Sequence, residues 1–119
     1  MSYDLDFWKL KKDTYLKNQE VYKKCSEEEI VDGLEDLPID SILNDIQIEI
    51  TDWKMKESNI DYENPNGSGV FQIFTTKQFV RFDCYGIEGE DMNLIIDVMD
   101  KYDLLLYDDP KVPQRYDGK

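Results

Sequence analysis

The chain has 119 residues, 27 of them acidic and 14 basic, which gives a formal net charge of −13, and it contains no histidine. Apolar residues make up 40% of the chain, which is enough for one domain with its own core. This composition excludes histidine-based acid–base chemistry, histidine metal sites, Ser-His-Asp and Cys-His nucleophiles, and electrostatic binding to nucleic acid.

The first half of the chain predicts a strand followed by two helices. Polar and apolar side chains alternate over residues 3–9, which is typical of a half-buried strand. Residues 18–31 predict a helix with Asn18 as its N-cap. A second helix is predicted over residues 38–48, because isoleucine and leucine recur there at helical spacing after Pro38.

The middle of the chain is harder to interpret. Isoleucines alternate with polar residues over 46–54, a pattern that fits either a helix end or a strand. We therefore place the end of the helix at about residue 46 and a strand from about 48 to 54. Residues 59–69 predict a loop, in which Asn66-Gly67 is a strong turn signal.

The second half predicts a hairpin, a helix and a final strand. Residues 70–75 and 79–85 are rich in β-branched and aromatic residues, and the short polar link between them favours an antiparallel hairpin. Apolar residues at helical spacing predict a helix over 90–102. Residues 104–107 predict the last strand.

The order of these elements predicts an α+β fold. We expect a single domain over residues 1–119, with a mainly antiparallel sheet and about three helices packed on one face. The tail, residues 111–119, is expected to be loosely ordered.

The N-terminal residues and the two cysteines help to predict the cellular compartment of the protein. The N-terminus has no basic start followed by an apolar run, and no apolar run approaches the roughly 20 residues of a spanning helix. We therefore expect a soluble cytoplasmic protein with no signal peptide and no membrane contact. Cys25 and Cys84 are far apart in the sequence, so two reduced thiols are the simplest interpretation, and a disulfide between them stays open.

Charge is unevenly distributed along the sequence. No base occurs between Lys24 and Lys54, whereas six of the 14 bases lie in the first 24 residues. If the fold keeps this separation, one surface is strongly anionic and attracts basic partners. The alternative is that these acids form solvated helix faces that keep the protein soluble. The candidate partner-binding residues are Glu27, Glu28, Glu29, Asp32, Glu35, Asp36 and Asp40.

Carboxylates are numerous enough to form chance pairs that imitate catalytic or metal sites. None of them has the spacing of an EF-hand loop. We therefore expect no catalytic residue, no metal ion and no cofactor. The pairs considered are Asp4/Asp6, Asp108/Asp109 and Glu88/Glu90/Asp91.

Two stretches, residues 2–9 (SYDLDFWK) and the block from Phe71 to Asp109, resemble a group of small, acidic, single-domain bacterial proteins. Several such groups act as immunity proteins beside polymorphic or contact-dependent toxins. The resemblance implies tight binding and neutralisation of a cognate toxin, often a basic nuclease, in the cytoplasm of the producing cell. It transfers no individual residues to this chain, because such interfaces are specific to each partner.

The acidic residues between Lys24 and Lys54 predict a non-enzymatic module that binds a basic protein and not a nucleic acid. The resemblance implies that this partner is a toxin domain. Two alternatives stay open. One is a general acidic interaction or regulatory module. The other is a carboxylate-based domain that binds a metal ion or a small ligand.

Overall fold

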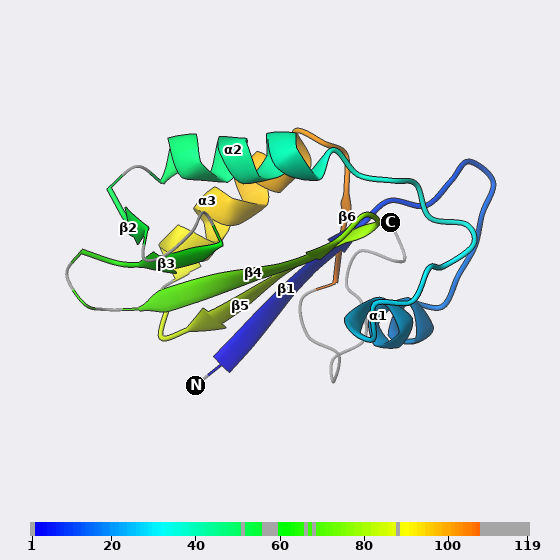
Figure 1. Ribbon diagram of the computed structural model, residues 1–119, viewed down its shortest axis with the longest axis horizontal. Coiled ribbons are helices and arrows are strands. Elements are labelled where there is room, and N and C mark those ends of the chain that lie inside the picture. Colours follow the sequence, from blue (N-terminus) through cyan, green and yellow to red (C-terminus); the bar gives the residue numbers. More distant parts are fainter. Residues whose placement is uncertain are drawn as a thin grey trace.

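The computed structural model describes residues 2–50, 52–55, 60–65, 67, 69–87 and 89–107. Its elements are β1 (Ser2–Trp8), α1 (Asn18–Ser26), α2 (Ile39–Glu49), β2 (Lys54–Met55), β3 (Asp61–Glu63), β4 (Val70–Thr76), β5 (Phe79–Tyr85), α3 (Gly89–Asp100) and β6 (Leu105–Tyr107). The strands form one antiparallel sheet in the order β2-β3-β4-β5-β1-β6 (Figure 1). The predicted α+β class and antiparallel sheet are confirmed.

The N-terminal strand lies inside the sheet, between β5 and β6. Its residues pair with β5 in a register that places Leu5 opposite Phe82 and Asp4 opposite Asp83. Because side chains alternate between faces along a strand, Leu5 and Phe82 share one face while the two aspartates share the other. The alternation predicted for residues 3–9 therefore separates an apolar face from a charged one.

Helices α2 and α3 cover the apolar face (Figure 1). Ile42 and Ile46 of α2, together with Ile95 and Met99 of α3, are buried against strand residues such as Phe82. Phe82 is fully buried, and its ring meets that of Phe7 edge-on at a centroid distance of 5.7 Å. This layer is the main hydrophobic core of the described residues.

Helix α1 lies at the opposite face of the sheet (Figure 1), so the prediction that the helices share one face is wrong for α1. Its buried residues Val21 and Cys25 pack in a second apolar cluster with Trp8 and Phe79, which point away from α2 and α3. The physical reason is the strand alternation itself. Trp8 breaks the apolar pattern of β1 and gives the charged face an apolar end, where a helix can dock.

Two predicted boundaries near the helices are wrong. Helix α1 ends at Ser26 and not at residue 31, because the chain turns at Glu28, which has a φ of 61°. Helix α2 continues to Glu49, so the strand predicted over 48–54 is reduced to Lys54–Met55. Ile46 and Ile48 lie in α2, and Ile50 directly follows it. Ile46 and Ile50 are buried, whereas Ile48 is 59% exposed.

The stretch predicted as a loop, 59–69, contains β3. The strand is short, and Tyr62 is its one buried side chain, so the sequence gives little periodicity to detect. The hairpin, the last helix and the last strand agree with prediction to within two residues. Asn66 and the tail 111–119 lie outside the described residues. Among the helices described, none is long and apolar enough to cross a membrane.

Candidate functional site

The segment from Glu27 to Asp40, which we call the acidic run, leads from α1 into α2 at one end of the molecule (Figure 1). Glu27, Glu28 and Glu29 are exposed and directly follow the last turn of α1. Their backbone amides satisfy carbonyls of that turn, at 3.0–3.2 Å. Carboxylates at the negative end of a helix dipole cost stability, each about 0.3–1 kcal/mol. These three glutamates are therefore not explained by the stability of α1.

A buried glutamine, Gln78, holds the next part of the acidic run in place by hydrogen bonds. Gln78 lies in the turn between β4 and β5 and is 4% exposed. Its Oε1 accepts a hydrogen bond from the Val31 amide at 2.9 Å, and its Nε2 donates to the carbonyl oxygens of Val31 at 3.0 Å and Leu34 at 3.3 Å. One side chain thus satisfies three backbone groups of the segment that carries Asp32.

The segment also pairs with the chain that follows β1. Lys11 donates its amide to the carbonyl of Gly33, and Glu35 donates its amide to the carbonyl of Lys9, both at 2.8 Å. Gly33 has a φ of 99°, and a Cβ there would lie 2.8 Å from Cγ2 of Thr14. Glycine is therefore required at this position. Together with Gln78, these bonds hold the backbone of residues 31–35 in one conformation.

The fold brings three of the seven candidate acids to one groove. Asp32, Glu35 and Asp36 line a cavity of about 440 Å³, together with Lys11 and Lys77. The lysines come from other parts of the sequence, so the charge separation seen along the chain is not kept here. The groove presents both signs of charge, with the exposed side chain of Ile30 beside them.

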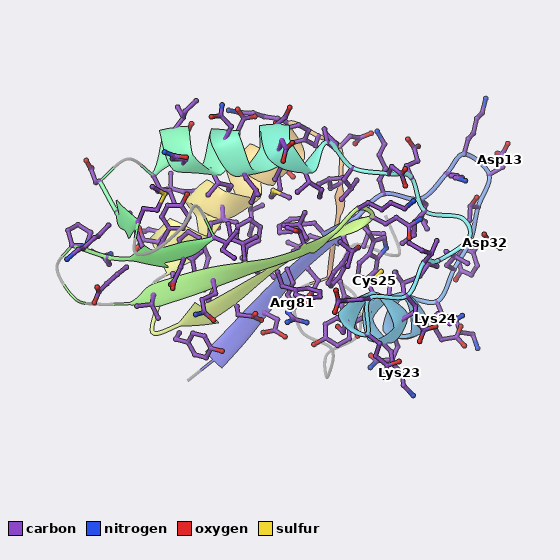
Figure 2. The ribbon with its side chains drawn as sticks, viewed as in Figure 1. Asp13, Lys23, Lys24, Cys25, Asp32 and Arg81 are labelled. Carbon is purple, nitrogen blue, oxygen red and sulfur yellow. The ribbon has the colours of Figure 1, made fainter. Side chains whose placement is uncertain are left out.

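The remaining candidates do not line that groove. Glu27, Glu28 and Glu29 follow α1, and Asp40 is exposed in the first turn of α2. An acid at the start of a helix is favourable with the dipole, so the position of Asp40 is also explained by helix stability. Figure 2 shows Asp32 at the outer edge of the molecule, away from Arg81 and from Cys25 of α1.

Sequence reasoning missed Lys11, Lys77 and Gln78. The lysines were missed because they reach the groove through long-range pairing. Gln78 gave one usable signal: it stands in a two-residue hairpin turn, since Thr76 pairs with Phe79, and such turns favour glycine and asparagine. A glutamine in such a turn therefore indicates that its side chain is needed for contacts outside the turn.

A second charged cluster lies between α1 and the sheet. Tyr22 donates its hydroxyl to Oδ2 of Asp4 at 3.1 Å, and Arg81 donates from Nε to Oδ1 of Asp83 at 2.9 Å and from Nη1 to Oγ of Ser26 at 3.3 Å. Burial raises the pKa of Asp83, and a hydrogen bond with Asp4 and its charge raise it further, while Arg81 opposes the shift. Two facing carboxyls are thus held with one guanidinium.

Neither cysteine is suited to nucleophilic chemistry. Cys25 and Cys84 are both free and buried. Burial, followed by the charge of Asp6, raises the pKa of Cys25 to about 11. Burial, followed by the charge of Asp83, raises the pKa of Cys84 to about 12. Both groups are therefore protonated thiols at neutral pH.

Within the part of the chain that the structure describes, no three histidine, cysteine, aspartate or glutamate residues are placed to hold a metal ion. Of the carboxylate pairs considered from the sequence, Asp4 and Asp6 share the charged face of the sheet. Glu88, Asp108 and Asp109 lie outside the described residues.

Comparison with models of known protein families finds no match, and comparison with curated proteins finds none either. The contacts and charges described above are therefore the basis of the proposals below.

Proposed function

We propose that this chain is a non-enzymatic protein-binding module that neutralises a basic toxin domain in the cytoplasm, as immunity proteins do. The surface that would bind consists of the acidic run, Glu27 to Asp40, and its groove. The observation that carries the proposal is the fixed backbone of residues 31–35, which presents charged side chains on a segment held by Gln78. A segment already held in one conformation loses less entropy on binding.

Two parts of the surface would have different roles: one would control the rate of association, and the other would control the selectivity for one partner. Glu27, Glu28 and Glu29 are exposed and form no ion pair within the described residues, so they would steer a basic partner over long range. The groove has Lys11 and Lys77 beside its acids. A partner would then need an acid opposite these lysines as well as bases opposite the acids, which favours one partner over others of similar net charge.

The test is a matched pair of charge-reversal variants. Basic proteins captured from the source lysate at low salt would first be assayed for toxicity or nuclease activity, with and without this chain. Association rates would then be measured for Glu27/Glu28/Glu29→Lys. The control is Glu90/Asp97/Asp100→Lys on α3, which changes net charge equally at exposed positions.

We expect the variant after α1 to slow association by about tenfold at low salt, more than the control does. The wild type should abolish the activity of the captured partner. Equal slowing by both variants would mean that net charge alone matters, and would contradict the proposed surface. A captured partner whose activity is unchanged by this chain would contradict neutralisation.

A further inference from the structure

The charged face of the sheet is only partly covered. Helix α1 reaches it through Tyr22 at Asp4 and Ser26 at Arg81. No other helix of the described residues lies over this face of the sheet (Figure 1). On this side Gln72 is exposed and Tyr85 is 45% exposed. A groove of 380 Å³ lies on the same part of the sheet. Its lining residues are Ile60, Asp61, Gln72, Ile73, Phe74, Arg81 and Asp83.

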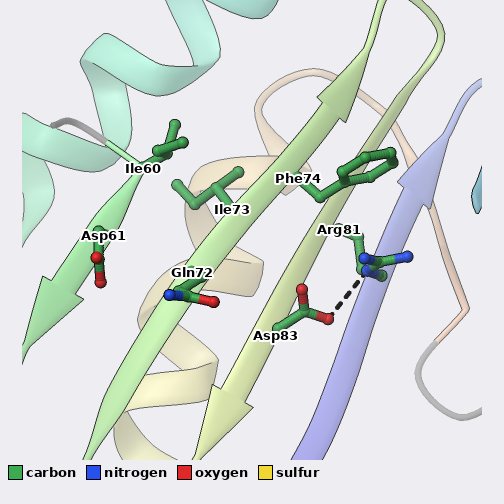
Figure 3. A pocket seen from close by; sticks show the side chains of 7 residues that line it. All are labelled: Ile60, Asp61, Gln72, Ile73, Phe74, Arg81 and Asp83. Carbon is green, nitrogen blue, oxygen red and sulfur yellow. Dashed lines mark hydrogen bonds and ion pairs between the residues drawn. The ribbon is translucent and has the colours of Figure 1, made fainter. Parts of the chain in front are cut away.

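The groove has more carboxylate than it has cation to balance it. Figure 3 shows Asp61 on one side and Asp83 on the other, with Arg81 turned to Asp83. The guanidinium of Arg81 is already engaged: it bonds Asp83 and Ser26, and its Cζ lies 4.6 Å from the centroid of the Phe74 ring. Among the described residues no ion pair reaches Asp61.

The neighbouring strand adds to this excess. Asp4 of β1 is the cross-strand partner of Asp83, so both carboxyls lie on the same face of the sheet, and the charge of Asp4 raises the pKa of Asp83. Two neighbouring carboxyls with a single nearby guanidinium, that of Arg81, leave this part of the face with an excess of negative charge. The groove also has apolar surface, from Ile60 and Phe74, along which the stem of a long side chain could lie.

We propose that this groove binds an arginine side chain presented by a basic segment of the protein partner. The guanidinium would lie between Asp61 and Asp83, and its methylene stem would pack on Ile60. Arginine fits better than lysine, because its planar, weakly hydrated guanidinium can bond two carboxylates at once and keeps its charge when partly buried. A nucleic acid is disfavoured, since its phosphates would meet these carboxylates.

This inference deepens the proposed function, because it names the chemistry of the partner at a second surface. The probe is acetyl-Gly-Arg-Gly-amide, and its control is the same peptide with citrulline, which has the shape of arginine without the charge. Backbone amide shifts would be followed by NMR at low salt. We expect saturable shifts at Asp61, Gln72 and Asp83 with the arginine peptide, with a dissociation constant on the order of millimolar.

Variants locate the binding. Asp61 and Gln72 are cross-strand partners on the exposed part of this face. We expect Asp61→Asn to weaken binding by about threefold to fivefold, and Gln72→Lys to abolish it by placing an ammonium group in the groove. The matched controls, Asp97→Asn on α3 and Gln47→Lys on α2, should bind as the wild type does. Thermal unfolding would establish that each variant is folded.

Equal shifts with the citrulline peptide, or equal weakening by Asp61→Asn and Asp97→Asn, would overturn the inference. So would shifts confined to residues 27–40. The two proposals fail separately. If the groove does not bind the peptide while charge reversal after α1 still slows association with the toxin, only the groove is wrong. If the groove binds and no partner is neutralised, only the function is wrong.

Discussion

The two faces of the sheet differ in what they bury. Toward α2 and α3, the strands contribute apolar side chains such as Phe7, Phe71 and Phe82. Toward α1, the same strands contribute Asp4 and Arg81 beside an apolar end at Trp8. An apolar layer gains stability from area removed from water, whatever its partners' orientation. A charged layer gains little, but each hydrogen bond fixes the position of the element across from it. The first face therefore holds the fold, and the second positions α1 and the acidic run.

The largest expected effect is the loss of a ring from the apolar face. Phe82→Ala removes a fully buried side chain that contacts the rings of Phe7 and Phe71. We expect the free energy of unfolding to fall by about 3–5 kcal/mol, because the tight packing of α2 and α3 leaves a cavity. Urea denaturation followed by circular dichroism measures it.

The matched control is the same substitution on the other face. Phe74→Ala removes a half-buried ring that contacts Phe79 and Arg81. We expect a loss of about 1–2 kcal/mol, because part of the ring is already in water. If Phe74→Ala proved as costly as Phe82→Ala, the stability would be shared evenly by the two faces and the comparison would be wrong.

A smaller effect is expected at Gln78, where one polar side chain holds a segment. Gln78→Ala leaves the amide of Val31 and the carbonyl of Leu34 without their partner. We expect the free energy of unfolding to fall by about 2 kcal/mol, the cost of unsatisfied buried polar groups. Hydrogen exchange at Val31 should accelerate more than exchange in β5. Urea denaturation and exchange measured by NMR would report both.

Gln72→Ala is the control, since Gln72 is exposed on β4. We expect it to change the free energy of unfolding by less than about 0.5 kcal/mol. Unchanged exchange at Val31 in Gln78→Ala would show that the pairing with Lys9 and Lys11 holds the segment without the glutamine.

The sequence was sufficient for elements whose signal is periodic. The helical spacing after Pro38 and that over 90–102 identify α2 and α3, and the hairpin follows from two β-rich runs. The sequence was insufficient where a single residue determines the end or the presence of an element. Glu28 takes a positive φ and ends α1, and Tyr62 alone marks β3. Neither signal extends over a window of residues.

The candidate site divides in the same way. The exposure of Glu27, Glu28 and Glu29 follows from their charge, and the structure has them exposed. The cations in the groove could not be inferred, because Lys11 and Lys77 arrive by pairing between distant segments. Charge counted along the chain therefore overestimated how anionic residues 32–36 are.

The smallest expected effect concerns the charged face and its dependence on pH. Burial raises the pKa of Asp83 in the folded protein above its ordinary value. At a pH between the ordinary pKa and the raised pKa, the Asp83 carboxyl has released its proton in the unfolded chain but still holds it in the folded protein. Folding then takes up a proton, so this group's contribution to stability is lost as pH rises through the folded pKa.

Asp83→Asn has no proton to lose at this position. We therefore expect its free energy of unfolding, relative to that of the wild type, to increase as pH rises from about 4 and to level off once the wild-type carboxyl is ionised. Urea denaturation at a series of pH values measures the difference, and Asp97→Asn controls for the loss of one negative charge. The opposite slope would mean that Arg81 outweighs burial and Asp4. Asp83 would then be held ionised by its ion pair with Arg81, and burial would not be the dominant influence on its pKa.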